Sequence, residues 1–259
     1  MRCGTNSAMK RVYLSPHLDD VVFSCGGLVW EEVQSGHHVE IWTLCAGDPP
    51  DEDYSSFVEM LHQAWGLESG VVARRRQEDV KACQTLGALP RHFQIPDCIY
   101  RRSPEVGAWL YTYEDALFGG LHPVEKPLVD ELQSRLRKEL QDVDRVIAPL
   151  GIGNHVDHEL TRKAVRDLGL PVYYYADYPY AREAINQSLL ELMDDSEDWQ
   201  QERHMIPQEA IAAWQKASLC YQSQFHIFWE DRQELREQIA AYSTSMSGMV
   251  LWKPAGGSN

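Results

Sequence analysis

Between residues 11 and 176, short apolar runs alternate with longer segments that carry apolar residues at helical spacing. A short apolar run suits a buried strand, whereas an apolar stripe that returns every three or four residues suits a helix. The expected strands cover residues 11–15, 39–44, 93–95, 144–150 and 172–176. The expected helices cover residues 20–35, 71–86, 128–140 and 156–168, with two more near 207–221 and 230–242. This alternation predicts an α/β fold of three layers, in which helices cover both faces of a mostly parallel sheet.

The chain is expected to form one domain, because no internal repeat, low-complexity tract or change of composition divides it. We expect a single α/β domain over residues 11–250, a flexible N-terminal segment over residues 1–10 and a C-terminal tail over residues 251–259. Residues 48–70 are expected to form an irregular connection with one short helix at most. Residues 96–122 form a connection longer than a compact domain needs, which is typical of a functional loop.

Composition narrows the classes of protein that the chain can belong to. The 259 residues are 44% hydrophobic and 24% charged, which is ordinary for a globular domain. No apolar stretch approaches the ~20 residues of a membrane span, and the first residues lack the apolar region of a secretion signal. We therefore expect no membrane span and a cytoplasmic location. The net charge of −15 argues against nucleic acid as a partner, because nucleic-acid phosphates require a cationic surface.

Ionisable side chains follow two of the expected strands directly. The first group, after residues 11–15, consists of His17, Asp19 and Asp20. The second group, after residues 144–150, consists of His155, Asp157 and His158. In an open parallel sheet, ligands bind outside the carboxyl ends of the strands. The two groups are therefore expected to meet at one edge of the sheet.

Two histidines and a carboxylate are typical ligands of a zinc-type ion, and they leave a coordination position open for water. His155 and His158 are three residues apart, so in the first turn of a helix they share a face. The same donors also suit Fe²⁺ or another divalent first-row ion. The alternative for Asp19 and Asp20 is a plain helix cap, because acidic residues favour helix N-termini without any ligand. The joint occurrence of the two groups favours the metal site.

The two motifs together resemble those of the PIG-L/LmbE-like family of zinc-dependent N-acetylglucosamine deacetylases. Ser-Pro-His-Leu-Asp-Asp is similar to the family's A-H-P-D-D-E-like motif, and His-Val-Asp-His is similar to its H-x-D-H motif. The segment from Arg75 to Gly87 is similar to the family's R-x-x-E-x-x-x-A-x-x-x-L-G helix. The resemblance is best over residues 11–176. It implies an LmbE-like, Rossmann-like sandwich.

The resemblance also implies a set of ligands and a general base. Zn²⁺ ligation is carried over to His17, Asp20 and His158. Asp19, which would lie beside the metal without binding it, is carried over as the general base. The chemistry is consistent with this assignment, because a carboxylate within hydrogen-bond reach of an activated water can accept its proton.

The remaining roles implied by the resemblance concern the substrate. His155 would face the oxyanion that develops during the reaction, with Asp157 supporting the orientation and charge of its imidazole. Arg75 matches an arginine that is often near the sugar, and it is the expected substrate-binding residue. The alternative is a pairing of Arg75 with Glu78 within one helix.

The chain departs from the family at several positions. Leu18 stands where many members have Pro, and Val21 stands where many have Glu. Some members have a catalytic Tyr two residues before the first His of the second motif, and here that position is Gly153. Another group or water must fill that role, or it is unfilled. Residues Tyr178 to Tyr180 are expected to approach the site after the strand over residues 172–176.

These observations predict a metal-dependent hydrolase that removes an N-acyl group, acetyl above all, from an amino-sugar-like substrate. The expected partner is a small N-acylated amino sugar or a glycoconjugate, and formation of a homo-oligomer stays open. One alternative is a metal-dependent phosphoesterase, which would favour two metals and cationic clamps on the phosphate. A second alternative is a non-catalytic relative that only binds a ligand, although the complete set of site residues argues against it.

Overall fold

A computed structural model of the chain describes residues 8–50, 54–66, 70–166, 168–181, 199–245 and 249–255. Within these residues seven strands form one sheet in the order β3-β2-β1-β4-β5-β7-β6. The strands are β1 (Lys10–Ser15), β2 (His38–Thr43), β3 (Leu89–His92), β4 (Arg145–Pro149), β5 (Val172–Tyr175), β6 (Trp199–His204) and β7 (Met249–Pro254). The strands from β3 to β5 are parallel, and β7 pairs antiparallel with both β5 and β6.

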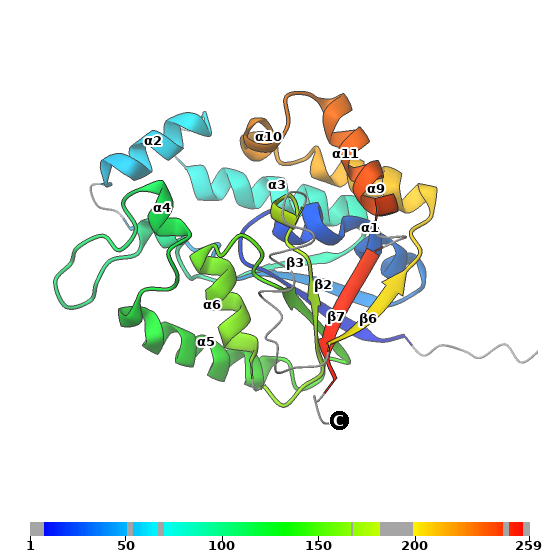
Figure 1. Cartoon of the computed structure of the whole chain (residues 1–259), viewed down its shortest axis with the longest axis horizontal. Coiled ribbons are helices and arrows are strands. Elements are labelled where there is room, and N and C mark those ends of the chain that lie inside the picture. The colour runs from blue at the N-terminus through cyan, green and yellow to red at the C-terminus, as the bar shows by residue number, and fades with distance from the viewer. Residues whose placement is uncertain are drawn as a thin grey trace, which may run out of the picture.

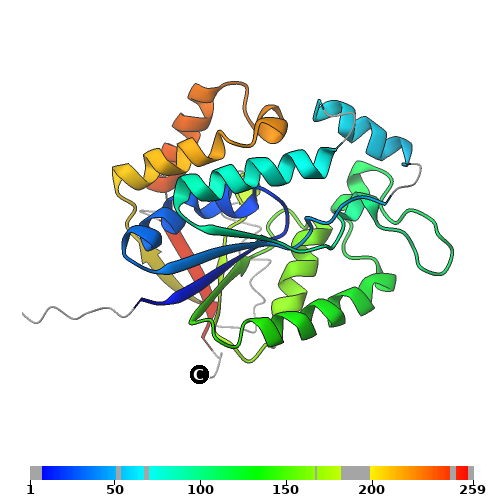
Figure 2. The same ribbon diagram turned by 180° about the vertical axis from the view of Figure 1, so that it is seen from behind.

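Helices cover both faces of this sheet. The longer ones are α1 (Asp20–Gln34), α2 (Ser56–Ala64), α3 (Val71–Leu86), α5 (Lys126–Glu139), α6 (Val156–Val165), α9 (Gln208–Ser218), α10 (Gln222–Phe228) and α11 (Arg232–Ser245). The short ones are η1 (Cys98–Tyr100), α4 (Glu114–Leu117) and η2 (Pro123–Glu125). Helices α1, α3, α9 and α11 lie on one face, and α5 and α6 lie on the other (Figures 1 and 2). The predicted three-layer α/β sandwich with a mostly parallel sheet is confirmed.

The layers follow from the alternation of side chains along each strand. In β1, Tyr13 packs in the core beneath α1 and α9, whereas Val12 and Leu14 pack in the core with α5 and α6. A strand that is covered on both faces has no solvent-facing side to carry polar residues. This is why the first strand reads as a continuous apolar run.

A third and smaller apolar core lies at the carboxyl edge of the parallel strands. Leu18, which follows β1, and Ala46, which follows β2, pack there with Phe57 of α2, Ile99 of η1 and Val156 of α6. This core anchors α2 and the 96–122 loop above the strand ends. This packing therefore supports the segments that surround the candidate site.

The third strand differs from its predicted position. The structure places β3 at Leu89–His92, and residues 93–95 lie beyond it, with Gln94 making only an isolated bridge to Cys45. Strand β3 lies at one edge of the sheet, and its four residues include Pro90, which lacks a backbone N–H. An edge strand can form without a run of buried apolar residues. The buried Phe93 therefore led to a strand being predicted at residues 93–95, beyond the actual one.

The predicted limits of the domain also need correction. The tail was expected from residue 251, but Leu251 and Trp252 are buried in β7. At the other end Lys10 already belongs to β1, while residues 1–7 lie outside the described residues. Helix α10 was not predicted. Among the described residues, none of the helices combines the length and the apolar character that crossing a bilayer requires.

The contact between α1 and α9 yields a prediction about stability. A Cβ on Gly26 would lie 2.5 Å from Cδ1 of Trp214, whose indole N–H donates to the Phe23 carbonyl at 3.2 Å. Overpacking typically costs about 1–3 kcal/mol, and Ala gains at most about 1 kcal/mol over Gly in a helix. We expect Gly26→Ala to lower the free energy of unfolding, measured by urea denaturation. Gly119→Ala is the control, because a Cβ there meets nothing closer than 3.5 Å. Equal unfolding midpoints for the two variants would contradict the packing described.

Candidate metal centre and active site

The turn between β1 and α1 places the first group of ionisable residues. The Ser15 hydroxyl donates to the His17 carbonyl at 2.6 Å and accepts from the Val21 backbone N–H at 3.2 Å. These two bonds replace part of the hydrogen bonding that the strand and the helix leave unmet at their ends. They hold Asp19 and Asp20 at the start of α1.

The capping alternative is wrong for Asp19. Asp19 stands at the N-cap position of α1, yet its side chain makes no capping hydrogen bond. Its carboxylate instead lies 3.4 Å from Nη2 of Arg75, and both side chains are buried. Asp20 turns the other way, and its Oδ2 accepts from the His17 backbone N–H at 2.7 Å. The two adjacent carboxylates therefore have separate surroundings.

Asp20 brings the two motifs together. Its Oδ2 lies 3.3 Å from Nδ1 of His17 and 3.4 Å from Nε2 of His158. The other nitrogen of each ring meets a second carboxylate, at 3.0 Å from Asp157 for His17 and at 2.6 Å from Asp177 for His158. Such outer carboxylates orient an imidazole and fix which nitrogen carries the proton. His17 Nδ1 and His158 Nε2 are left to face Asp20.

The side chains fit a divalent metal ion. Nε2 of His158 is buried and has no hydrogen-bond partner among the described residues. Ring nitrogens of His17, His155 and His158 lie within 4.8 Å of one another. Imidazole nitrogens and a carboxylate oxygen are the donors that zinc and similar ions take. The ligand set expected from the motifs, with Asp20 between two imidazoles, remains our proposal.

Charges within the site support this arrangement. Burial alone would lower the pKa of His158, but the Asp20 and Asp177 carboxylates outweigh burial and raise the pKa to about 10. For Asp20 burial acts to raise the pKa, and the His158 and His17 imidazoles outweigh it and hold the pKa well below the usual value. The cluster thus attracts positive charge strongly, which a proton or a metal ion can supply.

Asp19 has the properties of a group that exchanges protons near neutral pH. Burial raises the pKa of Asp19, the Arg75 guanidinium opposes that change, and the Asp20 charge adds to it. The resulting pKa is about 6. A carboxylate in this range is largely ionised at pH 7 and can still accept a proton during a reaction.

His155 is held in a defined tautomer. It is the N-cap residue of α6, and its Nδ1 accepts from the Asp157 backbone N–H at 3.2 Å. Burial, followed by the charge of His17, lowers the pKa of His155 well below its usual value. The neutral ring must then carry its proton on Nε2. The resemblance implied that Asp157 supports the charge of this imidazole, whereas the ring is neutral here. A neutral N–H is still a hydrogen-bond donor.

The Asp157 carboxylate contacts residues other than the His155 ring. It accepts from the Cys98 backbone N–H at 3.0 Å and from Nη1 of Arg101 at 2.5 Å, in addition to its bond with His17. Arg101 is buried between Asp157 and Glu125. Support for the His155 ring therefore comes from the Asp157 backbone, while its side chain orients His17.

Two residues that hold the site were missed in the sequence. Arg101 comes from the 96–122 loop, whose unusual length was the only signal. Asp177 follows β5, the next strand beyond β4, and its Oδ2 accepts from the backbone N–H groups of Gly151 and Ile152 at 2.8 and 3.0 Å. Its place at a third strand end of the same edge could have revealed it.

Arg75 does not form the alternative pair with Glu78. Glu78 contacts Nε of Arg74 at 3.2 Å and accepts from the Ser223 hydroxyl at 2.7 Å. The Arg75 guanidinium instead lies over the Trp65 ring, 5.1 Å from its centre, and reaches Asp19. Its predicted contact with a sugar stays a prediction.

Of the tyrosines expected near the site, only one is in contact with it. The Tyr178 ring is buried against Tyr242, with ring centres 4.6 Å apart, so its predicted approach is wrong. The Tyr180 ring lies 5.9 Å from the His158 ring in an edge-to-face arrangement. Tyr180 therefore borders the candidate metal centre.

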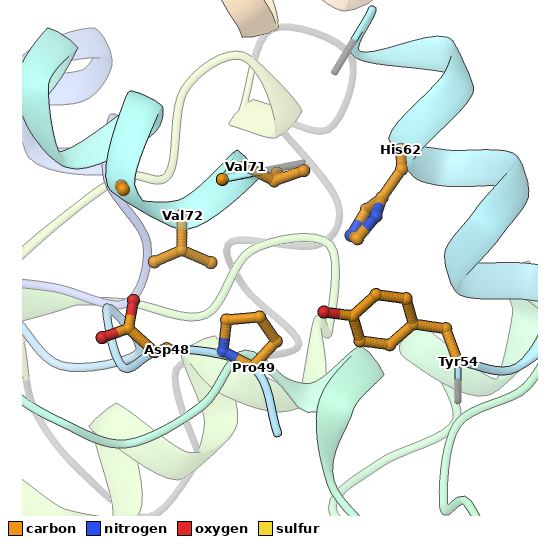
Figure 3. Close-up of a pocket in the computed structure, with 8 residues that line it drawn as sticks. Asp48, Pro49, Tyr54, His62, Val71 and Val72 are labelled. Carbon is orange, nitrogen blue, oxygen red and sulfur yellow. The ribbon is translucent and has the colours of Figure 1, made fainter. Parts of the chain in front are cut away.

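A surface pocket opens beside the N-terminal end of α3 (Figure 3). Its walls come from the segment after β2, from α2 and from the first turn of α3, and the labelled side chains are Asp48, Pro49, Tyr54, His62, Val71 and Val72. His62 hydrogen bonds to the Tyr100 hydroxyl at 2.7 Å, which ties α2 to the 96–122 loop. The pocket is thus lined by the described part of the 48–70 segment and by the start of α3.

Comparison with known proteins identifies the family. Residues 12–168 match the family described as GlcNAc-PI de-N-acetylase (PIG-L), and the chain belongs to this family. The family and the LmbE-like fold predicted from the motifs are confirmed.

Two curated relatives are each named 2'-N-acetylparomamine deacetylase. The one from Niallia circulans is 31% identical over 189 residues, which cover 65% of this chain and 66% of the relative. The one from Streptomyces fradiae is 28% identical over 193 residues, which cover 68% of this chain and 60% of the relative. The chain thus aligns with slightly less than two thirds of the length of either relative.

Solved structures of deacetylases share the whole fold. The zinc inhibited form of teicoplanin deacetylase Orf2 has a TM-score of 0.79 and 27% identity, covering 94% of this chain and 97% of that chain. The A40926 pseudoaglycone deacetylase Dbv21 has a TM-score of 0.74 and 27% identity, covering 96% of this chain and 97% of that chain.

Asp177 provides a test of the metal centre. Asp177→Asn removes the carboxylate that accepts from Nδ1 of His158, and outer partners of this kind typically change metal affinity by about 10–100-fold. We expect a loss of that size in competition titrations with a zinc chelator. Asp130→Asn, on the exposed face of α5, is the control. Unchanged zinc affinity in Asp177→Asn would show that His158 does not bind the ion.

Proposed function

We propose that this protein is a metal-dependent N-deacetylase that hydrolyses the acetamide of an amino sugar, free or within a glycoconjugate. The observation that carries the proposal is the convergence of His17, Asp20 and His158, with the separate carboxylate of Asp19 beside them. Membership of the family and the deacetylases among its relatives support this reaction.

His17, Asp20 and His158 would hold the ion, which when bound polarises an amide carbonyl and lowers the pKa of water. Asp19 accepts a proton from the water that attacks the carbonyl carbon. Arg75 keeps Asp19 in place and favours its ionised form. Asp19 then passes the proton to the amine nitrogen as the C–N bond breaks, so the products are acetate and the free amine.

His155 stabilises the negative charge that develops on the substrate during the reaction. As water attacks, negative charge develops on the carbonyl oxygen, and a donor already in place stabilises that charge best. Nε2–H of His155 is that donor, because the Asp157 backbone N–H keeps Nδ1 as the acceptor. Asp157 contributes in addition by orienting the imidazole of His17.

The parts of the substrate beyond the acetamide contact the segments around the site. Arg75 of α3 lies 3.9 Å from Asp97 of the 96–122 loop, and the first turn of the same helix lines the pocket. We assign the recognition of the sugar, including the contact expected of Arg75, to this side of the site. Exchange of Tyr54 or His62 for Ala should raise KM for the sugar more than it lowers kcat; the reverse result would contradict the assignment.

We further assign zinc as the ion and the cytoplasm as the location. Elemental analysis of the protein as purified tests the ion, and iron in place of zinc would revise the assignment. Fractionation of the cells that make the protein tests the location, and recovery outside the cytoplasmic fraction would contradict it.

Acetate release tests the activity. The zinc-loaded protein should release acetate from N-acetylglucosamine derivatives or from an N-acetylated aminoglycoside such as 2'-N-acetylparomamine. Removal of the ion with a chelator should abolish the release, and zinc should restore it, because the described side chains around the site include no other strong electrophile. Absence of acetate release from the whole panel would contradict the proposal, and phosphate release from sugar phosphates would favour the phosphoesterase alternative.

Substitution of Asp19 and of Asp20 should have different effects on kcat and on zinc content. Asp19→Asn should lower kcat by about 10²–10⁴-fold and leave the zinc content near that of the wild type, because it removes only the base. Asp20→Asn should lose zinc, because it removes a ligand. Zinc content by elemental analysis and kcat by acetate release give the two readouts, with Asp130→Asn as the control for each. Loss of zinc from Asp19→Asn, or full zinc content in Asp20→Asn, would reverse the roles.

A further inference from the structure

The Tyr180 ring packs directly against the backbone of Gly153. A Cβ on Gly153 would lie 3.1 Å from Cγ of Tyr180 and 3.3 Å from its Cβ. The φ angle of Gly153 is +89°, which disfavours any side chain on separate grounds. Residue 153 is thus a glycine for two reasons, and the Tyr180 ring fills the space above it.

Two more rings enclose Tyr180. His158 lies 5.9 Å away edge to face, and Phe118 of the 96–122 loop lies 6.4 Å away edge to face. Phe118 also contacts His155 at 5.6 Å. Tyr180 therefore stands among the imidazoles of the site, and its ring is fixed on three sides.

The Tyr180 ring is only partly buried, and its hydroxyl differs from those of three fully buried tyrosines. Those of Tyr13, Tyr175 and Tyr221 hydrogen bond to Glu32, to the Leu14 carbonyl and to Asp79 at 2.8, 3.1 and 2.7 Å. The Tyr180 hydroxyl bonds to no residue among those that the structure describes. A partly exposed hydroxyl that no protein group engages is available to a bound ligand.

The position of the hydroxyl follows from the packing. Because the Cβ and Cγ end of Tyr180 lies against Gly153, its hydroxyl end projects away from Gly153. The ring also meets His158 edge to face, so this tyrosine lies beside the imidazoles of the site. A protonated hydroxyl that lacks a protein partner can donate to a substrate.

We propose that Tyr180 is a further catalytic residue, whose hydroxyl donates a hydrogen bond to the substrate's amide oxygen as that oxygen gains negative charge. It acts together with Nε2–H of His155. No bond to Tyr180 forms or breaks, and the proton stays on the phenol oxygen. The inference rests on the proposed deacetylation and adds a donor that the two metal motifs do not contain.

Tyr180→Phe tests the inference, because it removes the hydroxyl and keeps the ring on Gly153. Loss of one such donor typically lowers kcat by about 10²–10³-fold. We expect a fall in kcat of that order, with KM for the N-acetyl sugar and zinc content within about twofold of the wild type. Tyr178→Phe is the matched control, because that ring is buried against Tyr242 away from the imidazoles. Its kcat should equal that of the wild type.

The other outcomes distinguish a failure of the proposed role of Tyr180 from a failure of the proposed deacetylation. A wild-type kcat in Tyr180→Phe, a change confined to KM, or a fall in kcat that parallels lost zinc overturns the role of Tyr180 and leaves the deacetylation intact. A wild-type protein that releases no acetate overturns the proposed function, and this inference with it.

Discussion

A carboxylate inside a protein is stable only when neighbouring groups compensate its charge, and four buried aspartates meet at the carboxyl edge of this sheet. They are Asp19, Asp20, Asp157 and Asp177. Their partners come from α3, α6 and the 96–122 loop as well as from the turn after β1. Compensation of these charges therefore joins segments that are far apart in the sequence, and it fixes the geometry of the site.

The compensation is incomplete in a way that agrees with the proposed chemistry. Nε2 of His158 is buried and makes no hydrogen bond within the described part of the chain, although it lies 3.4 Å from the Asp20 carboxylate. The hydroxyl of the partly buried Tyr180 bonds to none of the described residues. An unpaired buried polar atom is costly, and native proteins tolerate few of them. Under the two proposals above, a metal ion would bind Nε2 of His158, and a substrate oxygen would accept from the Tyr180 hydroxyl.

The sheet provides the frame for this cluster without determining the reaction. Parallel strands bring the residues after β1, β4 and β5 to one edge, and the small core around Leu18 and Ala46 holds the loop and α2 above it. The segments 48–70 and 96–122 then surround the site on the outside. We propose that recognition of a particular sugar resides in these segments, because the strand ends are already occupied by the proposed ligands and their partners.

The sequence by itself determined the layers, the edge of the sheet where the site lies and the central residues of the site. Apolar periodicity is local, so a strand such as Lys10–Ser15 or a helix such as Asp20–Gln34 can be read from neighbouring residues. The adjacency of histidine and aspartate to two strand ends is local as well. This is why His17, Asp20 and His158 could be named before their geometry was known.

Only the tertiary structure decided the partners and their directions. His158 meets a carboxylate 19 residues away, and Asp19 meets a guanidinium 56 residues away. No local pattern encodes a contact across such a separation. The same holds for Arg101, for the place of Tyr180 above Gly153, and for the edge strand β3, whose few residues pair on one side only. Periodicity specifies which side of an element is buried, whereas packing of the complete chain specifies what each buried polar group touches.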